Sequence, residues 1–160
     1  MKSFLLSWLA KRYAGADLRT FLEERTGAWV VWEAGPWRPP AVGRDTLAAA
    51  PATRLLSAGE SLAIALAPDP GGDVRVGRAP ESDVVIDDAT LSRAHLVLHR
   101  GPDGDWTARD TGSSNGTRVD GARIGSAPVP ITPGARIEAG TVRLTFYDGA
   151  SLFLRLRGAG

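Results

Sequence analysis

The chain of 160 residues contains no cysteine and only two lysines, Lys2 and Lys11. The absence of cysteine excludes disulfide bonds and thiolate metal sites. No other pattern indicates a metal or a cofactor, so we expect neither. The net charge of +1 gives no support to a general role on nucleic acid or on a membrane surface. These absences favour a protein partner over nucleic acid.

Long apolar runs are also missing. No segment approaches the roughly 20 apolar residues that a membrane span needs, so we expect no stable membrane insertion. The first residues could be mistaken for a secretory signal, but the apolar core Phe4–Ala10 is interrupted by Ser7 and is followed at once by Lys11 and Arg12. A signal peptide requires a longer apolar core and a small-residue cleavage site. We therefore predict a cytoplasmic location.

The composition is that of a globular protein with many turns. Hydrophobic residues make up 43% and charged residues 23%, with 19 glycines and 11 prolines; this combination is typical of a protein built from short strands. From about residue 61 the apolar residues recur with a period of two. The predicted strands are Leu62–Leu66, Val74–Gly77, Val84–Ile86, His95–His99, Trp106–Asp110, Thr117–Val119, Ala135–Glu138, Val142–Tyr147 and Leu152–Leu156. Many short strands separated by turns indicate an antiparallel β-sandwich.

The N-terminal part has a different pattern. Apolar spacing predicts a helix over Lys2–Tyr13 and a second over Leu18–Arg25, with Asp17 as its N-cap. Trp29–Glu33 reads as a strand. We divide the chain into a Trp-rich helical extension (1–40), a connecting segment (41–52) and a β-sandwich domain (53–157). The fold class is thus mainly β, with a short N-terminal α-helical extension.

Tryptophan is concentrated in that extension, which holds four of the five: Trp8, Trp29, Trp32 and Trp37. Aromatic residues at this density indicate a buried contact or an interaction surface. We favour helices that pack onto the sandwich and complete its core. The alternative is a docking element for a second partner or for another copy of the chain.

Three polar turns carry the candidate chemistry. They contain Gly77-Arg78, then Ser92-Arg93-Ala94-His95, then Ser114-Asn115-Gly116. An arginine can hold two phosphate oxygens at once, and serine hydroxyls and turn amides can donate to the others. Asparagine can hold a peptide main chain through both its donor and its acceptor. His95 reads as a structural residue that fixes a loop. Together these groups favour recognition of a phosphate on a peptide.

This order of motifs resembles the forkhead-associated (FHA) domain, whose pattern is Gly-Arg, then Ser-x-x-His, then Asn-Gly. The similarity extends over roughly Ala52–Arg157. It implies a non-catalytic bacterial module that binds phosphothreonine in a partner phosphorylated by a Ser/Thr kinase. By resemblance, the phosphopeptide-binding residues are Arg78, Ser92, Arg93, Ser114 and Asn115. Gly77, His95 and Gly116 would shape the site.

Two alternatives remain at this point. Asp110-Thr111-Gly112 resembles the active-site turn of aspartic proteases, and a single copy would require a homodimer of the retroviral type. Arg109 directly precedes this aspartate, where a cation would keep the carboxylate charged. The second alternative is an FHA-type scaffold that assembles proteins without reading phosphate.

Overall fold

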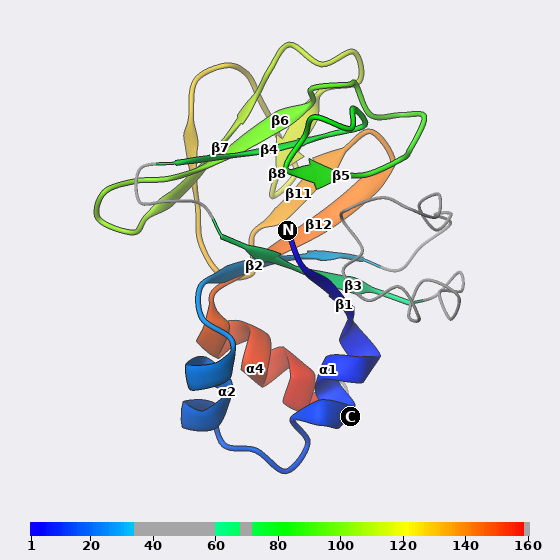
Figure 1. Cartoon of the computed structure of the whole chain (residues 1–160). Coiled ribbons are helices and arrows are strands. Elements are labelled where there is room, and N and C mark those ends of the chain that lie inside the picture. The colour runs from blue at the N-terminus through cyan, green and yellow to red at the C-terminus, as the bar shows by residue number, and fades with distance from the viewer. Residues whose placement is uncertain (34–59, 68–71, 159–160) are drawn as a thin grey trace.

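The computed structural model describes residues 1–33, 60–67 and 72–158. Within these residues, two β-sheets pack face to face, and a layer of helices covers the outer face of the larger sheet (Figure 1). The predicted mainly β sandwich with N-terminal helices is confirmed. The predicted connecting segment (41–52) and Trp37 lie outside the described residues.

The larger sheet has seven strands in the order β1-β3-β2-β12-β11-β8-β9. Their bounds are β1 Ser3–Leu5, β3 Leu62–Leu66, β2 Ala28–Trp32, β12 Val142–Tyr147, β11 Arg136–Ala139, β8 Thr117–Val119 and β9 Ala122–Ile124. All neighbouring strands in this sheet are antiparallel. β1 and β9 were not predicted from the sequence, because three-residue strands carry little periodic signal.

The smaller sheet has five strands in the order β10-β7-β6-β4-β5. Their bounds are β10 Val129–Ile131, β7 Trp106–Asp110, β6 Leu96–Arg100, β4 Asp73–Gly77 and β5 Val84–Val85. The β4–β5 pair is parallel and the others are antiparallel. Leu96 and Leu98 point into the core between the sheets, as the alternation in this strand predicted.

β2 lies in the middle of the larger sheet and is buried on both faces. Val30 and Trp32 belong to the core between the sheets, whereas Trp29 and Val31 belong to a second cluster beneath the helices. A strand that is covered on both sides needs no polar alternation, which explains its uninterrupted apolar sequence. The N-terminal segment therefore supplies the sandwich with strands as well as helices, because β1 pairs with β3 and β2 pairs with both β3 and β12.

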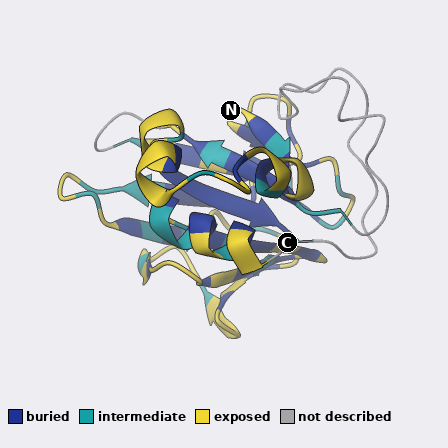
Figure 2. Cartoon of the chain, turned by 90° about the horizontal axis from the view of Figure 1, so that it is seen from below, coloured by how far each residue is buried: buried dark blue, intermediate teal, exposed yellow. Residues whose placement is uncertain are grey.

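The helices are α1 Leu6–Arg12, α2 Leu18–Glu24 and α4 Gly149–Gly158. Their inward sides are buried against the sheet and their outer sides are exposed (Figure 2). Asp17 caps α2 as predicted, accepting a hydrogen bond from the Thr20 amide at 2.9 Å. The helix expected over Lys2–Tyr13 begins later, because Ser3–Leu5 pairs with β3 as a strand. Packing of these helices onto the sheet matches the favoured interpretation of the extension.

The strand predicted at Leu152–Leu156 is wrong, because these residues lie in α4. Leucines at alternate positions suggested a strand, yet Leu154 is 70% exposed while Leu152 and Leu156 are buried. Asp148 starts the helix: its carboxylate accepts from the Ser151 amide at 2.8 Å, and the Ser151 hydroxyl accepts from the Asp148 amide at 3.1 Å. This reciprocal cap is a helix-start signal that the alternation obscured.

Removing the Phe21 ring tests whether the helical layer is part of the folding unit. Phe21 is fully buried, and its ring lies 4.9 Å from that of Tyr13 and 5.5 Å from that of Phe153. We expect Phe21→Ala to lower the free energy of unfolding by about 3–5 kcal/mol, measured by urea denaturation. Leu22→Ala, at a neighbouring position that is 38% exposed, is the control and should cost far less. Equal effects would contradict tight packing of α2.

Candidate functional site

The sequence-predicted site residues gather at one end of the sandwich. Gly77 ends β4, the 91–95 segment leads into β6, and residues 111–116 connect β7 to β8. Hydrogen bonds join the three segments to one another, as described below. The structure therefore brings together the three motifs that the sequence places far apart.

Arg78 is bound directly to the loop that contains Ser92. The Arg78 amide donates to the Ser92 carbonyl at 3.0 Å, and its side-chain Nε donates to the Leu91 carbonyl at 3.1 Å. Among the described residues, no carboxylate pairs with this guanidinium. Because Nε already donates to Leu91, the two terminal nitrogens of Arg78 are the atoms available to bind a ligand.

Gly77 permits the close approach of these two segments. A Cβ built at Gly77 would lie 2.2 Å from the Arg93 carbonyl oxygen, which is backbone and cannot move aside alone. Arg93 itself is exposed and lies 3.6 Å from Glu81. An ion pair between side chains this exposed is weak, so Arg93 is free to exchange its partner.

The two candidate serines meet across the loops. The Ser114 amide donates to the Ser92 hydroxyl at 3.0 Å. This bond occupies a lone pair of the Ser92 oxygen and leaves its O–H available as a donor. Asn115 donates from Nδ2 to the Thr90 carbonyl at 2.7 Å, which fixes the orientation of its amide and leaves Oδ1 as a free acceptor.

His95 joins the serine loop to the asparagine turn from inside the protein. Its ring is fully buried. Nδ1 accepts from the Ser92 amide at 3.0 Å, so the proton of the neutral ring is on Nε2, which donates to the Gly116 carbonyl at 2.9 Å. One imidazole therefore holds both loops at a fixed separation.

Asp110 organises the 111–116 turn. One carboxylate oxygen accepts from the amides of Gly112 and Ser113, at 2.7 and 2.8 Å, and the other accepts from the hydroxyls of Ser113 and Thr117, at 2.5 and 2.6 Å. Burial alone would raise the pKa of Asp110, but these hydrogen bonds outweigh it and hold the pKa below its ordinary value. Both oxygens are thus engaged by residues 112–117, so the Asp-Thr-Gly sequence has a structural role here that needs no protease dyad.

Several residues that support the site were not predicted. Asp88 accepts hydrogen bonds from the Thr90 amide and hydroxyl, and the Thr90 hydroxyl accepts from the Thr141 amide at 2.9 Å. Thr111 ties the turn to the Ala94 carbonyl at 2.7 Å. An aspartate followed two or three residues later by glycine or serine is a turn signal, and it could have identified Asp110 as a structural residue. The contact between Thr90 and Thr141 spans distant segments and has no local signal.

No cluster of metal-ligating side chains is present in the described part of the chain. Likewise, none of the helices formed by residues 1–33, 60–67 and 72–158 is long and apolar enough to cross a membrane.

Comparisons with known proteins identify the family of this chain. The FHA domain family matches residues 74–140. The oxoglutarate dehydrogenase inhibitor of Corynebacterium glutamicum is 33% identical over 84% of this chain and 85% of its own length. A solved structure concerned with phosphothreonine-dependent FHA domain interactions shares the fold, with a TM-score of 0.51, 18% identity, and coverage of 76% of this chain and 96% of that one. The chain therefore belongs to the FHA family, whose members recognise phosphorylated motifs, and it is a non-catalytic binding module.

Some relatives are much longer than this chain. The ABC transporter ATP-binding/permease protein Rv1747 of Mycobacterium tuberculosis is 35% identical over 78% of this chain, which covers only 16% of that protein. The chain also spans about half the length of two corynebacterial relatives that it matches. Membership of the family therefore defines what kind of domain this chain forms, but it does not identify the chain's cellular partners.

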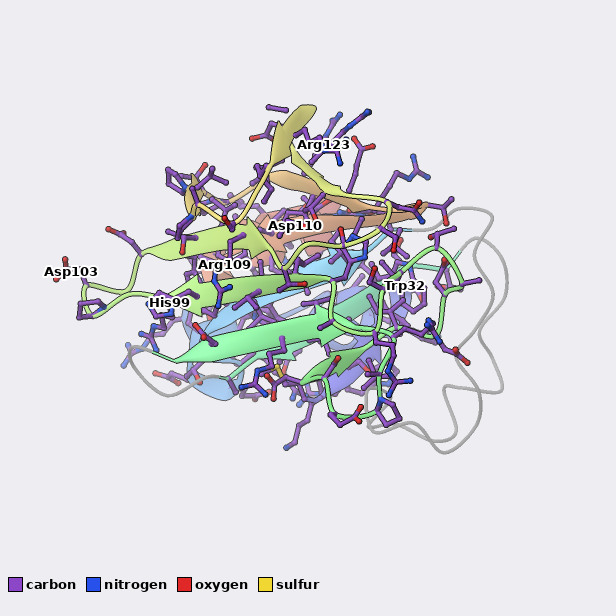
Figure 3. All side chains as sticks on the ribbon, turned by 90° about the horizontal axis from the view of Figure 1, so that it is seen from above. Trp32, His99, Asp103, Arg109, Asp110 and Arg123 are labelled. Carbon is purple, nitrogen blue, oxygen red and sulfur yellow. The ribbon has the colours of Figure 1, made fainter. Side chains whose placement is uncertain are left out.

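Replacing Asp110 tests its role in the turn. Asp110→Asn should lower the free energy of unfolding at neutral pH by about 1.5–3 kcal/mol, because charge-assisted hydrogen bonds are lost. The folded-state pKa is lowered, so the wild-type advantage is complete above the unfolded pKa of about 3.9 and disappears as the pH falls through the folded pKa. Denaturation curves across this range measure the difference. Asp103→Asn, on an exposed hairpin away from Asp110 (Figure 3), should show no such pH-dependent difference.

Proposed function

We propose that this chain binds phosphothreonine peptides at the three-loop site, with Arg78, Ser92 and Ser114 around the phosphate. Asn115 would hold the peptide main chain and Arg93 would lie at the rim, while Gly77, His95 and Gly116 shape the loops. One observation carries the proposal: Arg78, a cation with no carboxylate partner among the described residues, is hydrogen-bonded to the same loop whose Ser92 hydroxyl meets the Ser114 amide.

The chemistry of the ligand suits this arrangement. Phosphothreonine carries about −1.5 to −2 charges at neutral pH and has three strong acceptor oxygens. The terminal nitrogens of a guanidinium can engage two of these oxygens in parallel. The Ser92 hydroxyl keeps its proton available as a donor, and the exposed Ser114 hydroxyl is a second donor next to it. Hydrogen bonds hold the Arg78 and Ser92 side chains before the ligand arrives, which lowers the entropic cost of binding.

The partner in this proposal is a protein phosphorylated by a bacterial Ser/Thr kinase. Relatives named as an oxoglutarate dehydrogenase inhibitor and as a glycogen accumulation regulator support a regulatory role. A cytoplasmic location belongs to the same proposal, because a kinase that makes the ligand requires nucleoside triphosphate. The proposal also includes a second partner, or another copy of the chain, that binds the helical layer. The half-exposed Trp8, stacked on Phe4 with ring centroids 5.6 Å apart, supports it.

Two variants of Arg78 test the phosphate contact. Arg78→Ala should weaken phosphothreonine-peptide binding at least about thirtyfold, which corresponds to roughly 2 kcal/mol for a truncated charge pair. Arg78→Lys should also weaken binding, since an ammonium cannot engage two oxygens in a plane. Fluorescence anisotropy with matched phosphorylated and unphosphorylated peptides measures the affinities. Arg19→Ala, in an exposed ion pair on α2, is the charge-matched control. Equal binding of both peptides by the wild type would instead favour the phosphate-independent scaffold.

The affinity should also depend on pH through the ligand. Phosphothreonine loses its second negative charge as the pH falls through about 6. We expect binding to weaken across this interval, measured by calorimetry with a peptide that has no other group titrating there. A peptide carrying glutamate in place of phosphothreonine is the control and should bind weakly without this step. A flat profile would argue against recognition of the dianion.

A further inference from the structure

A hollow of about 380 Å³ opens beside the asparagine turn, next to the candidate phosphate site. Asn115 and Gly116 form one wall, and Thr90 lies on another. Two arginines also line it, Arg118 from β8 and Arg123 from β9. This hollow therefore adjoins the residue proposed to hold the peptide main chain, and no step of phosphate recognition uses it.

The strand register places two arginines directly opposite each other beside this hollow. Arg123 is directly opposite Arg118 in the β8–β9 pair, and Arg118 is directly opposite Glu138 in the β8–β11 pair. Glu138 in turn faces Arg143 across β11 and β12. The row thus contains three cations and one carboxylate. Like charges at directly opposed positions destabilise a sheet, so the Arg118–Arg123 pair lowers the local stability of the sheet.

The register places one carboxylate beside this pair, that of Glu138 opposite Arg118. No carboxylate of the described residues forms an ion pair with Arg118 or Arg123. Glu138 lines the same hollow and is shared by register between Arg118 and Arg143. The lining of the hollow therefore has an excess of positive charge.

Arg123 is also held at the asparagine turn. Gly116 has φ +77°, and a Cβ built there would lie 3.2 Å from Arg123 Nη2 and 3.3 Å from its Cζ and Nε. Near-equal distances to three atoms mean that the guanidinium lies against the glycine as a group. The bare backbone of Gly116 thus gives the guanidinium its place beside Asn115, and Arg123 occupies the yellow hairpin at the rim of the sandwich (Figure 3).

We propose that Arg118 and Arg123 form a second anion subsite, which selects phosphothreonine peptides that carry another negative charge close to the phosphothreonine. The shared chemistry is an anionic oxygen group, supplied by an acidic side chain or by a second phosphorylated residue. Guanidinium groups suit both. The inference rests on the proposed function, because the peptide reaches this hollow only if Asn115 holds its main chain.

The binding test uses alanine-based phosphothreonine peptides in which one flanking position at a time carries Glu, Gln or phosphoserine. At one position Glu should bind about fivefold tighter than Gln, in line with an exposed ion pair, and phosphoserine at least as tightly as Glu. Arg123→Gln should abolish this preference and leave the affinity for the Gln peptide nearly unchanged. Added salt should reduce the preference. Arg136→Gln is the matched control, since Arg136 lies in the same sheet opposite an uncharged Thr145.

The outcomes separate the two proposals. If no phosphothreonine peptide binds the wild type, the proposed function fails and this inference fails with it. If the Gln peptides bind but Glu and phosphoserine give no gain at any position, the second subsite alone is excluded. An equal loss of affinity for Glu and Gln peptides in Arg123→Gln would also overturn it.

A thermal melt without peptide provides an independent readout. If the Arg118–Arg123 pair is retained for binding, Arg123→Gln should melt at the same temperature as the wild type or higher, because a repulsion is removed. Arg136→Gln should leave the melting temperature unchanged. A marked fall confined to Arg123→Gln would identify a structural arginine and would overturn the proposal.

Discussion

The buried imidazole of His95 holds the candidate site in one piece. It accepts from the Ser92 amide with one nitrogen and donates to the Gly116 carbonyl with the other. Every residue proposed to contact the phosphothreonine itself lies on a segment that this ring fixes directly or through one further bond, such as that from the Ser114 amide to the Ser92 hydroxyl. Since the ring is fully buried, water does not compete for these bonds. The loops are therefore positioned by the core of the sandwich rather than by the ligand.

Some residues of the family motifs shape the loops, whereas others are exposed and available to a ligand. Gly77 allows two backbones to approach, and Asp110 satisfies the amides of its own turn. These residues shape the loops without facing a ligand. Arg78, Ser114 and Asn115 are exposed at the same end of the sandwich and keep unused donors or acceptors. A rigid framework that carries its ligand-binding donors and acceptors at loop tips is the arrangement expected of a recognition module.

Much of the fold could be predicted from the sequence, because period-two alternation and turn residues identify strands such as Trp106–Asp110 and Val142–Tyr147. α4 was missed, because the alternate leucines 152, 154 and 156 fit a strand and obscured the capping signal of Asp148 and Ser151. The site motifs were visible as local patterns. The opposition of Arg118 and Arg123 was not, because it depends on the register of two strands. Long-range pairs such as Thr90 and Thr141 depend on the fold as a whole.

The position of β2 has a consequence for how this chain reaches its folded state. Residues 28–32 pair on one side with residues 62–66 and on the other with residues 142–147. A ribosome synthesises the first of these strands long before the last, so the apolar Trp29–Trp32 segment must wait for its second neighbour. Contacts between segments so distant in sequence slow folding, and an unpaired apolar strand is prone to aggregate in the meantime. The 28–32 strand of a nascent chain is therefore exposed to aggregation until residues 142–147 have been synthesised.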